Sequence, residues 1–213
     1  MEVGERVHAT VSGYIDDNTG WTTAKNHKDI LVDFKPTPCE DFPGGNLYRG
    51  QMEIQVPKEV IIKYVNPLHG GELRKKWDKD VNDLRTLRQI GDNTWILHTL
   101  TNSAALGMIS PRDFVDCLVK SETAERIITC GVSVDYPECA SLPKYVRGWN
   151  HPCGNLLLDV PGKPGYTRIV NFIQPDIKGM LPKSLVEGAI PTSIIGFFTN
   201  LRNILKKDGC LRS

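Results

Sequence analysis

The last quarter of the chain carries one long apolar stripe, which restricts the possible folds more than any other feature. Apolar residues recur between positions 186 and 205 at intervals of 4, 4, 3, 4 and 4 residues. This spacing follows the turn of an α-helix and predicts an amphipathic helix of about five turns. Such a stripe needs an equally long apolar surface to cover it, and a curved β-sheet offers one. The stripe consists of Val186, Ile190, Ile194, Phe197, Leu201 and Leu205.

The predicted helix contains three residues that weaken helices, Gly188, Pro191 and Gly196. A glycine costs about 1 kcal/mol and an interior proline about 3 kcal/mol relative to alanine. One interpretation is an ordinary core helix that is packed on a sheet, with a kink or a restart at Pro191. The other is a helix of moderate stability that shifts as a lid over a binding site.

The preceding segments predict a sheet built mainly from neighbouring antiparallel strands. Apolar runs at 21–24 and 30–34 flank a polar turn and indicate a hairpin. Pro57 is expected to begin a helix at 58–65. Turn residues separate the later strands, which favours a meander, and the fold class is therefore α+β. Further strands are expected at residues 47–56, 83–90, 94–101, 114–120, 126–135, 146–160 and 167–174.

Length, charge and cysteine content limit the function classes. The 213 residues suit a single domain over 1–213, and a net charge of +1 gives no general attraction to nucleic acid, so we expect no nucleic-acid partner. The N-terminus lacks the apolar stretch of a signal peptide, and no run approaches the roughly 18 apolar residues of a membrane span. The six cysteines form no C-x-x-C pair. We therefore expect free thiols, a cytoplasmic location and a monomer.

Motifs for common catalytic chemistry are missing from the sequence. There is no H-E-x-x-H, no P-loop and no G-x-S-x-G elbow, and the five histidines lack metal-ligand spacing. His151 and Cys153 lie two residues apart and share one side of a strand, but no third group supports a thiol nucleophile. We expect no cofactor, no metal ion and no catalytic residue.

Five stretches carry motifs of a known family. The longest is NSAALGMISPRDFVD at 102–116, and the others are GNLYR at 45–49, KWD at 76–78, YVRGWNHPCG at 145–154 and DIKGMLPKS at 176–184. In this order they resemble the StAR-related lipid-transfer (START) domains, in particular the small single-domain cytosolic carriers of sterols and bile acids. The resemblance implies a helix-grip fold, in which a curved antiparallel sheet wraps around a long C-terminal helix and encloses one lipid.

Strand alternation then gives the residues that are expected to line the cavity. If Thr99 faces inward, alternate residues on its strand do as well, and the same holds for the strands that contain Leu118 and Thr129. Thr99, Asp116, Thr129 and Ser133 are the candidate partners for a ligand hydroxyl, although an exposed position costs less for the Asp116 carboxylate. Alternation also places Gly131 on the inward face. The expected ligand-binding residues are Trp95, Leu97, Thr99, Thr101, Phe114, Asp116, Leu118, Thr129, Ser133, Ile190, Ile194, Phe197 and Leu201.

The sequence departs from some sterol-binding members of the family at two of these positions. Those members place an acidic residue and an arginine where this chain has Thr99 and Leu118. Specificity for cholesterol is therefore not carried over. Cholesterol, an oxysterol, a bile acid and another isoprenoid lipid all stay open as the ligand.

Two surface features are expected to meet a membrane. The resemblance implies that Leu106, Gly107, Met108 and Ile109 form an apolar gate beside the helix; the alternative is that these residues tuck into the core. Cations near the helix suit an anionic membrane surface, or simply a solvated helix end where they offset the helix dipole. These cations are Lys183, Arg202, Lys206 and Lys207.

Three functions are compatible with these features. The first is a non-enzymatic carrier that moves a sterol-class lipid between membranes. The second is a grip-fold enzyme such as a hydrolase, which needs a nucleophile, a base or a metal inside the cavity. The third is a lipid sensor or storage protein that acts through a protein partner.

Overall fold

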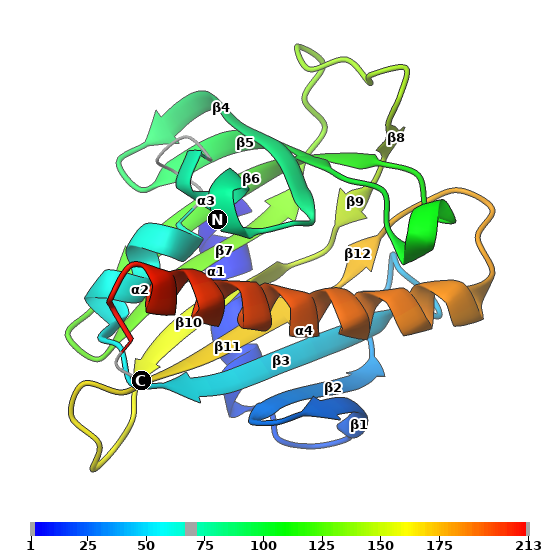
Figure 1. Cartoon of the computed structure of the whole chain (residues 1–213). Helices are drawn as coiled ribbons and strands as arrows, with labels where there is room; N and C mark the ends of the chain where they lie inside the picture. The colour runs from blue at the N-terminus through cyan, green and yellow to red at the C-terminus, as the bar shows by residue number, and fades with distance from the viewer. Residues whose placement is uncertain (1–2, 67–71, 212–213) are drawn as a thin grey trace.

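The computed structural model describes residues 3–66 and 72–211 and is built around one strongly curved sheet (Figure 1). Among these residues, nine strands follow the order β1-β2-β3-β11-β10-β7-β6-β5-β4, with every neighbouring pair antiparallel. The strand β8 (Val146–Arg147) runs parallel to β6, and β9 (Trp149–Asn150) pairs with β12 (Pro175–Asp176). The nine strands are β1 (Thr22–His27), β2 (Ile30–Pro36), β3 (Asn46–Ile54), β4 (Val81–Gly91), β5 (Thr94–Thr101), β6 (Arg112–Glu122), β7 (Arg126–Ser133), β10 (Cys153–Asp159) and β11 (Thr167–Ile173).

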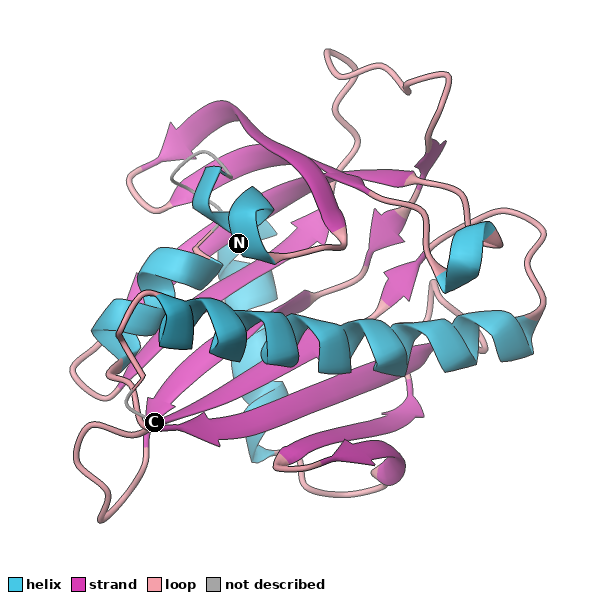
Figure 2. Ribbon diagram, in the orientation of Figure 1, coloured by secondary structure: helices cyan, strands magenta, loops and turns pink. Residues whose placement is uncertain are grey.

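Helices cover both faces of this sheet. The long helix α4 (Lys183–Lys207) crosses the front face in Figure 2, and α1 (Val3–Asp16) packs against the back. Two short helices, α2 (Lys58–Val65) and α3 (Glu72–Trp77), lie beside the C-terminal end of α4, and a 3₁₀ turn (Ala105–Gly107) follows β5. No helix in the described ranges is both long and apolar enough to cross a membrane.

The strands β10 and β11 show why the sheet is buried on both faces. Their side chains alternate between the two faces with the period of two that a strand imposes. Leu156 and Phe172 join the apolar cluster under α1, whereas Leu157 and Ile169 join the cluster under α4. The sheet therefore lies between two apolar layers, and the layer under α4 contains the site described below.

The helix α4 is buried unevenly along its length. From its middle to its C-terminal end the helix is fixed in the core through Ile194, Phe198 and Leu205, all at most 1% exposed. In its N-terminal half Val186 and Ile190 are only half-buried. The helix runs from Lys183 to Lys207 as one element with Pro191 inside, so the structure shows no restart at this proline.

Glycine at position 50 lets α4 lie directly on β3. A Cβ atom there would lie 2.4 Å from Cγ2 of Ile194 and 2.7 Å from Cε2 of Phe198. Both distances are shorter than any normal contact, so a side chain at Gly50 would push the helix away from the sheet.

The expected α+β class, with a curved antiparallel sheet around a C-terminal helix, is confirmed, but one predicted strand is wrong. The segment 146–160 is divided into β8, β9 and β10. Pro152 lacks an N–H group for strand pairing, and the N–H of Gly148 turns to the carbonyl of Asp113. Helix α3 and the 3₁₀ turn were not expected.

Candidate functional site

A cavity of about 370 Å³ lies between the sheet and the N-terminal half of α4. Its walls come from β5, β6, β7, β10 and β11, from Ala189, Ile190 and Ser193 of α4, and from the loops before β6 and α4. This volume lies in the range of cavities that hold small molecules.

Several residues expected from strand alternation line this cavity. The structure brings together the inward faces of β5, β6 and β7 with one residue of α4, as the period of two required. Asp116 is among them, so its carboxyl faces the cavity and not the solvent. The expected residues found at the cavity wall are Thr99, Thr101, Phe114, Asp116, Leu118, Thr129, Gly131 and Ile190.

The other expected residues lie outside this wall. Trp95 and Leu97 of β5 do not line the cavity, although they pair in register with Leu118 and Asp116 of β6, which do. The remaining helix residues are packed in the core, where the ring of Phe197 lies 5.3 Å from that of Trp77 in α3. The core residues in question are Ile194, Phe197 and Leu201. The helix stripe alone did not distinguish a cavity wall from a packed core.

Ser133 orients Asp116 without lining the cavity. Its hydroxyl donates to Oδ1 of Asp116 at 2.6 Å and accepts the backbone N–H of Asn150 at 2.7 Å, while the amide of Asn150 donates to Oδ2 of Asp116 at 3.0 Å. Burial raises the pKa of Asp116, and these hydrogen bonds only partly oppose the rise. The environment thus favours the neutral carboxyl.

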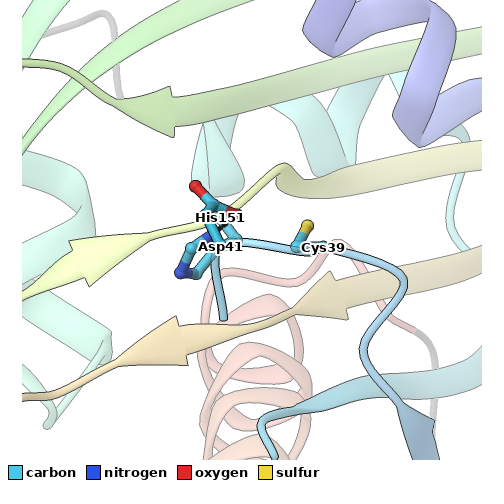
Figure 3. Close-up of side chains that lie close together, drawn as sticks. All are labelled: Cys39, Asp41 and His151. Atoms are coloured by element: carbon cyan, nitrogen blue, oxygen red, sulfur yellow. Dashed lines mark ion pairs between the residues drawn. The ribbon is translucent and has the colours of Figure 1, made fainter. Parts of the chain in front are cut away.

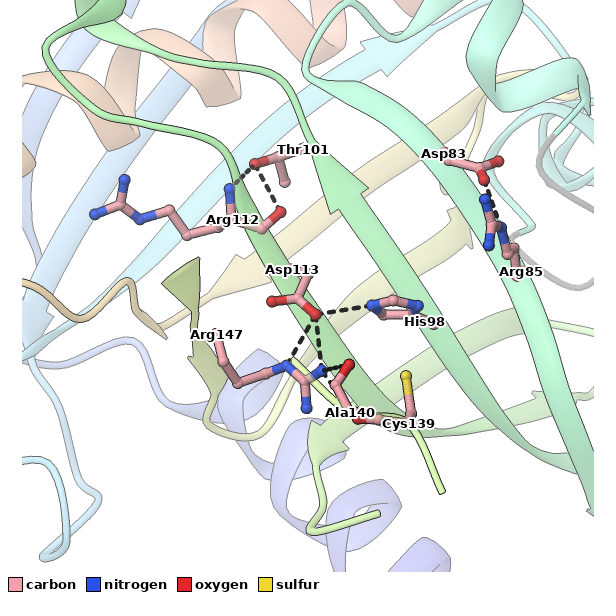
Figure 4. Close-up of polar contacts among 9 residues, drawn as sticks. All are labelled: Asp83, Arg85, His98, Thr101, Arg112, Asp113, Cys139, Ala140 and Arg147. Atoms are coloured by element: carbon pink, nitrogen blue, oxygen red, sulfur yellow. Dashed lines mark hydrogen bonds and ion pairs between the residues drawn. The ribbon is translucent and has the colours of Figure 1, made fainter. Parts of the chain in front are cut away.

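Arg112 at the start of β6 ties two loops together at the cavity. Its Nε donates to the carbonyl of Ile177 at 2.9 Å, and its Nη2 donates to the carbonyl of Lys178 at 3.2 Å. Its Nη1 donates to Ser110, and Thr101 hydrogen-bonds the backbone of the arginine (Figure 4). The guanidinium is therefore occupied by protein groups, and burial lowers the pKa of Arg112.

The polar residues that β10 and β11 contribute were not among the expected ones. These segments were predicted as strands, but their faces were not assigned. The same alternation that places Leu157 and Ile169 in the core also places Asn155 and Asn171 at the cavity. That signal was available in the sequence. The additional lining residues include Arg112, Asn150, Cys153, Asn155, Asn171, Ile173, Ile177 and Ser193.

The expected gate loop divides into exposed and buried residues. Leu106 is fully exposed and Met108 is 60% exposed, whereas Ile109 is 5% exposed and reaches the cavity wall. Gly107 and the two residues before it have positive φ angles, a backbone conformation that is costly for non-glycine residues. A second loop adds the fully exposed Met180 before α4. Only Ile109 follows the alternative in which the loop tucks into the core.

The four expected cations do not form one surface. Lys183 lies at the N-terminal end of α4 beside Glu187, and Arg202 donates to both carboxylate oxygens of Asp29 at 2.7 and 2.6 Å. Lys206 and Lys207 lie at the other end, about 35 Å from Lys183 at 1.5 Å per residue.

Polar contacts hold the N-terminal half of α4 over the cavity. Lys25 donates to the hydroxyl of Thr192 at 2.6 Å, and Ser193 donates to Asp80. Water can replace such contacts at little cost, unlike the packed contacts of the C-terminal half. This half of the helix therefore fits the lid interpretation.

A buried charge cluster sits on β6 next to the cavity wall but points away from it. The carboxylate of Asp113 accepts from His98 at 2.8 Å and from Arg147 at 2.8 and 3.0 Å (Figure 4). Burial alone would raise the pKa of Asp113, but the hydrogen bonds from Arg147 and His98 lower it. Arg147 also donates to the carbonyl of Cys139, so the cluster anchors the loop before β8.

Cys39, Asp41 and His151 form a second cluster, and none of them lines the cavity (Figure 3). Their donor atoms lie within 4.8 Å of one another, a proximity that their distant sequence positions did not reveal. Thiolate, carboxylate and imidazole are zinc ligands. However, the Asp41 side chain is 76% exposed, and burial raises the pKa of the Cys39 thiol. We assign no metal to this cluster.

Comparisons with known proteins agree with this architecture. The family model of the START domain matches residues 38–209. StAR-related lipid transfer protein 5 of Bos taurus is 37% identical over 207 residues, which cover 97% of this chain and 95% of the relative. StAR-related lipid transfer protein 6 of Homo sapiens is 34% identical and covers 96% and 90%, respectively.

Solved structures show the same arrangement. Human StAR-related lipid transfer protein 5 matches with a TM-score of 0.89 at 34% identity, over 96% of this chain and 95% of that one. The match confirms the helix-grip fold that the motifs implied. The Zhui aromatase/cyclase of a Streptomyces species matches with a TM-score of 0.52 at 6% identity, over 76% of this chain and 93% of that one, which shows a shared fold alone.

Proposed function

Because this chain belongs to the START domain family, we propose that it holds one sterol-class lipid in the cavity beneath α4 and carries it between membranes. The family and the names of the relatives support lipid binding and transfer as the general activity. The observation that carries the proposal is a lined cavity beneath the less buried half of α4, beside an exposed apolar loop. The single domain over 1–213, the cytoplasmic location and the monomeric state stay predictions.

The charges around the cavity favour a neutral ligand. Both lining guanidiniums are occupied, Arg112 by loop carbonyls and Arg74 by Asp78, whose Oδ2 lies 2.6 Å from the Nε of Arg74. Burial also raises the pKa values of the lining carboxyls Asp80 and Asp116, and the same desolvation would penalise the carboxylate of a ligand. Among the described lining residues no cation is free to pair with the carboxylate of a bile acid, which would therefore be buried at a high desolvation cost. We therefore favour cholesterol or an oxysterol.

Exposed apolar side chains near the cavity define the proposed membrane contact. The 3₁₀ turn and the N-terminal half of α4 form the two sides of an open groove. Leu106, Met108 and Met180 lie on the two loops that flank this part of the helix. Their insertion into the lipid headgroup layer would draw the loops apart and expose the cavity to the membrane. Among the four cations, only Lys183 lies at this end of α4.

The chemistry of the cavity argues against an enzyme. No histidine is among the described residues that line it, so Cys153 has no neighbouring imidazole there. Burial raises the pKa of Cys153 well above its usual value, which keeps the thiol protonated and weakly nucleophilic. We therefore propose a non-enzymatic function.

The first experiment identifies the ligand. The purified protein is incubated with liposomes that contain cholesterol, 25-hydroxycholesterol, a bile acid, phosphatidylcholine and ceramide, and the lipid recovered with it is measured by mass spectrometry. We expect one neutral sterol per chain. Recovery of the bile acid would contradict the charge argument, and recovery of phospholipid or no lipid would contradict the sterol assignment. Tight sterol binding without movement between liposomes would favour the sensor.

The gate is tested with Met108→Asp and a matched control, Ile90→Asp. Both residues are more than half exposed, but Ile90 lies at the other end of the β4–β5 hairpin. Met108→Asp should slow sterol transfer between anionic liposomes about tenfold, because a carboxylate resists insertion into the membrane, and should leave the thermal unfolding midpoint unchanged. Equal transfer rates in the two variants would refute the gate.

A further inference from the structure

Three polar residues form a row across the cavity wall. Asn155 of β10 pairs in register with Asn171 of β11 on one side and with Thr129 of β7 on the other. Residues in register on adjacent strands share one face of the sheet, and all three line the cavity. The next residue along the row is Gly50 of β3, where α4 touches the sheet.

This row marks the closed inner end of the cavity. Two residues further along each strand, on the same face, lie Ile127, Leu157 and Ile169, which are at most 1% exposed and belong to the packed core. In the opposite direction the chain leaves β11 and reaches Pro175 of β12 at the cavity wall, about 13 Å from Asn171 at 3.3 Å per residue. A ligand that enters past the gate loop therefore meets the polar row last.

Asn171 is left with an unused hydrogen-bonding group. Its side-chain amide donates to Oδ1 of Asn155 at 2.8 Å. Its own Oδ1 is buried without a partner, and the residue is 7% exposed. A buried polar atom without a partner costs about as much as a lost hydrogen bond, so such atoms need an explanation. Side-chain amides rotate readily about χ2, which lets this group turn toward an occupant of the cavity.

We infer that the Asn155–Asn171 pair is the hydroxyl-recognition site of the cavity and selects a hydroxylated neutral lipid. This inference rests on the proposed function. It adds which group of the ligand is recognised and where in the cavity that group binds. A hydroxyl both donates and accepts one hydrogen bond, which matches an amide pair that offers a free acceptor and further N–H groups. A carboxylate only accepts, so it cannot satisfy Oδ1 of Asn171.

The test compares three probes on wild-type protein and two variants. The probes are cholesterol, 5-cholestene, which lacks the ring hydroxyl, and 25-hydroxycholesterol, which has a second hydroxyl on its tail. In Asn155→Leu/Asn171→Leu both partners become apolar, a change that leaves no buried amide unpaired and preserves folding. Asn203→Leu, at an exposed position of α4, is the control. Dissociation constants come from titration with each sterol in detergent-free solution.

Wild-type protein and the control should prefer a hydroxylated sterol over 5-cholestene by about tenfold, the size of one buried hydrogen bond. The double variant should bind all three probes within about twofold of one another. If the double variant loses a wild-type preference for cholesterol over 5-cholestene, the ring hydroxyl binds at the pair. If it loses only a preference for 25-hydroxycholesterol over the other two probes, the tail hydroxyl binds there.

Two outcomes overturn the inference in different ways. An undiminished hydroxyl preference in the folded double variant would refute the role of the pair while leaving the carrier function intact. Absence of binding of all three sterols to the wild-type protein would instead refute the proposed function and remove the premise of the inference. Circular dichroism and a thermal melt of each variant separate both outcomes from misfolding.

Discussion

Two isoleucines one turn apart on α4 test whether the helix is fixed at one end only. Ile194 is 1% exposed and packs in the core, whereas Ile190 is half-buried and faces the cavity. Ile194→Ala should lower the free energy of unfolding by about 3 kcal/mol, because the truncation leaves a void among packed side chains. Ile190→Ala should cost less than about 1 kcal/mol, because the cavity provides few atoms for its side chain to contact. Alanine gains a few tenths of a kcal/mol of helix propensity in both variants, so this effect cancels in the comparison.

Urea unfolding of the lipid-free protein measures both values, with the fluorescence of its four tryptophans as the signal; one of them, Trp77, contacts Phe197. Lipid release to acceptor liposomes is then measured in urea-free buffer, where both variants are folded. Ile190→Ala should release sterol faster than Ile194→Ala despite its higher stability, because it removes side-chain atoms of α4 that cover the cavity. Equal losses of stability, or slower release from Ile190→Ala, would refute the division of α4 into a fixed half and a covering half.

Two further predictions follow from single positions. Gly50→Ala should destabilise the protein by about 1–3 kcal/mol and increase hydrogen exchange in α4, because the new methyl group collides with Ile194 and Phe198; unchanged exchange would contradict the close contact. Asp116→Asn tests the raised pKa of Asp116. Because the folded state holds this proton more tightly than the unfolded state, its contribution to stability is fully present below about pH 4 and is lost as the pH rises through the raised pKa of the folded state. The stability of wild-type protein relative to Asp116→Asn should therefore be greater at pH 5 than at pH 8, and a constant difference in urea unfolding would contradict the assignment.

Local periodicity predicted most of the fold and part of the cavity. The apolar stripe predicted α4, and alternation placed Thr99, Asp116 and Thr129 on one face because that face is a property of each strand alone. The extent of the cavity along this face depends on α2 and α3, which pack on the C-terminal half of α4. That packing is a tertiary effect, so the sequence did not show that Phe197 and Leu201 belong to the core.

Contacts between distant segments set the remaining features. Arg112 stood in the family motif at 102–116, two residues before an expected strand, but nothing in the sequence showed that its guanidinium holds a loop more than sixty positions away. The division of 146–160 also depends on a distant contact, since a Cβ at Gly148 would lie 2.3 Å from the ring of Phe114. By contrast, Asn155 and Asn171 could have been assigned to the cavity from alternation alone.

Because α4 is packed in the core only toward its C-terminal end, its N-terminal half can bend away from the sheet like a beam that is supported at one end. Pro191 lies between the less buried half of the helix and the packed half. It has no N–H to donate to the carbonyl of Glu187, and Gly188 and Gly196 lie on either side of it. Bending is therefore easiest at this point, and a pull on the end near Lys183 meets polar contacts, such as that between Glu187 and Asn46 of β3, before it reaches the packed half. In the proposed membrane contact, a membrane that holds the neighbouring loops would supply such a pull, whereas water would not. In the proposed transfer cycle the helix would therefore stay closed in water and open only at a membrane surface.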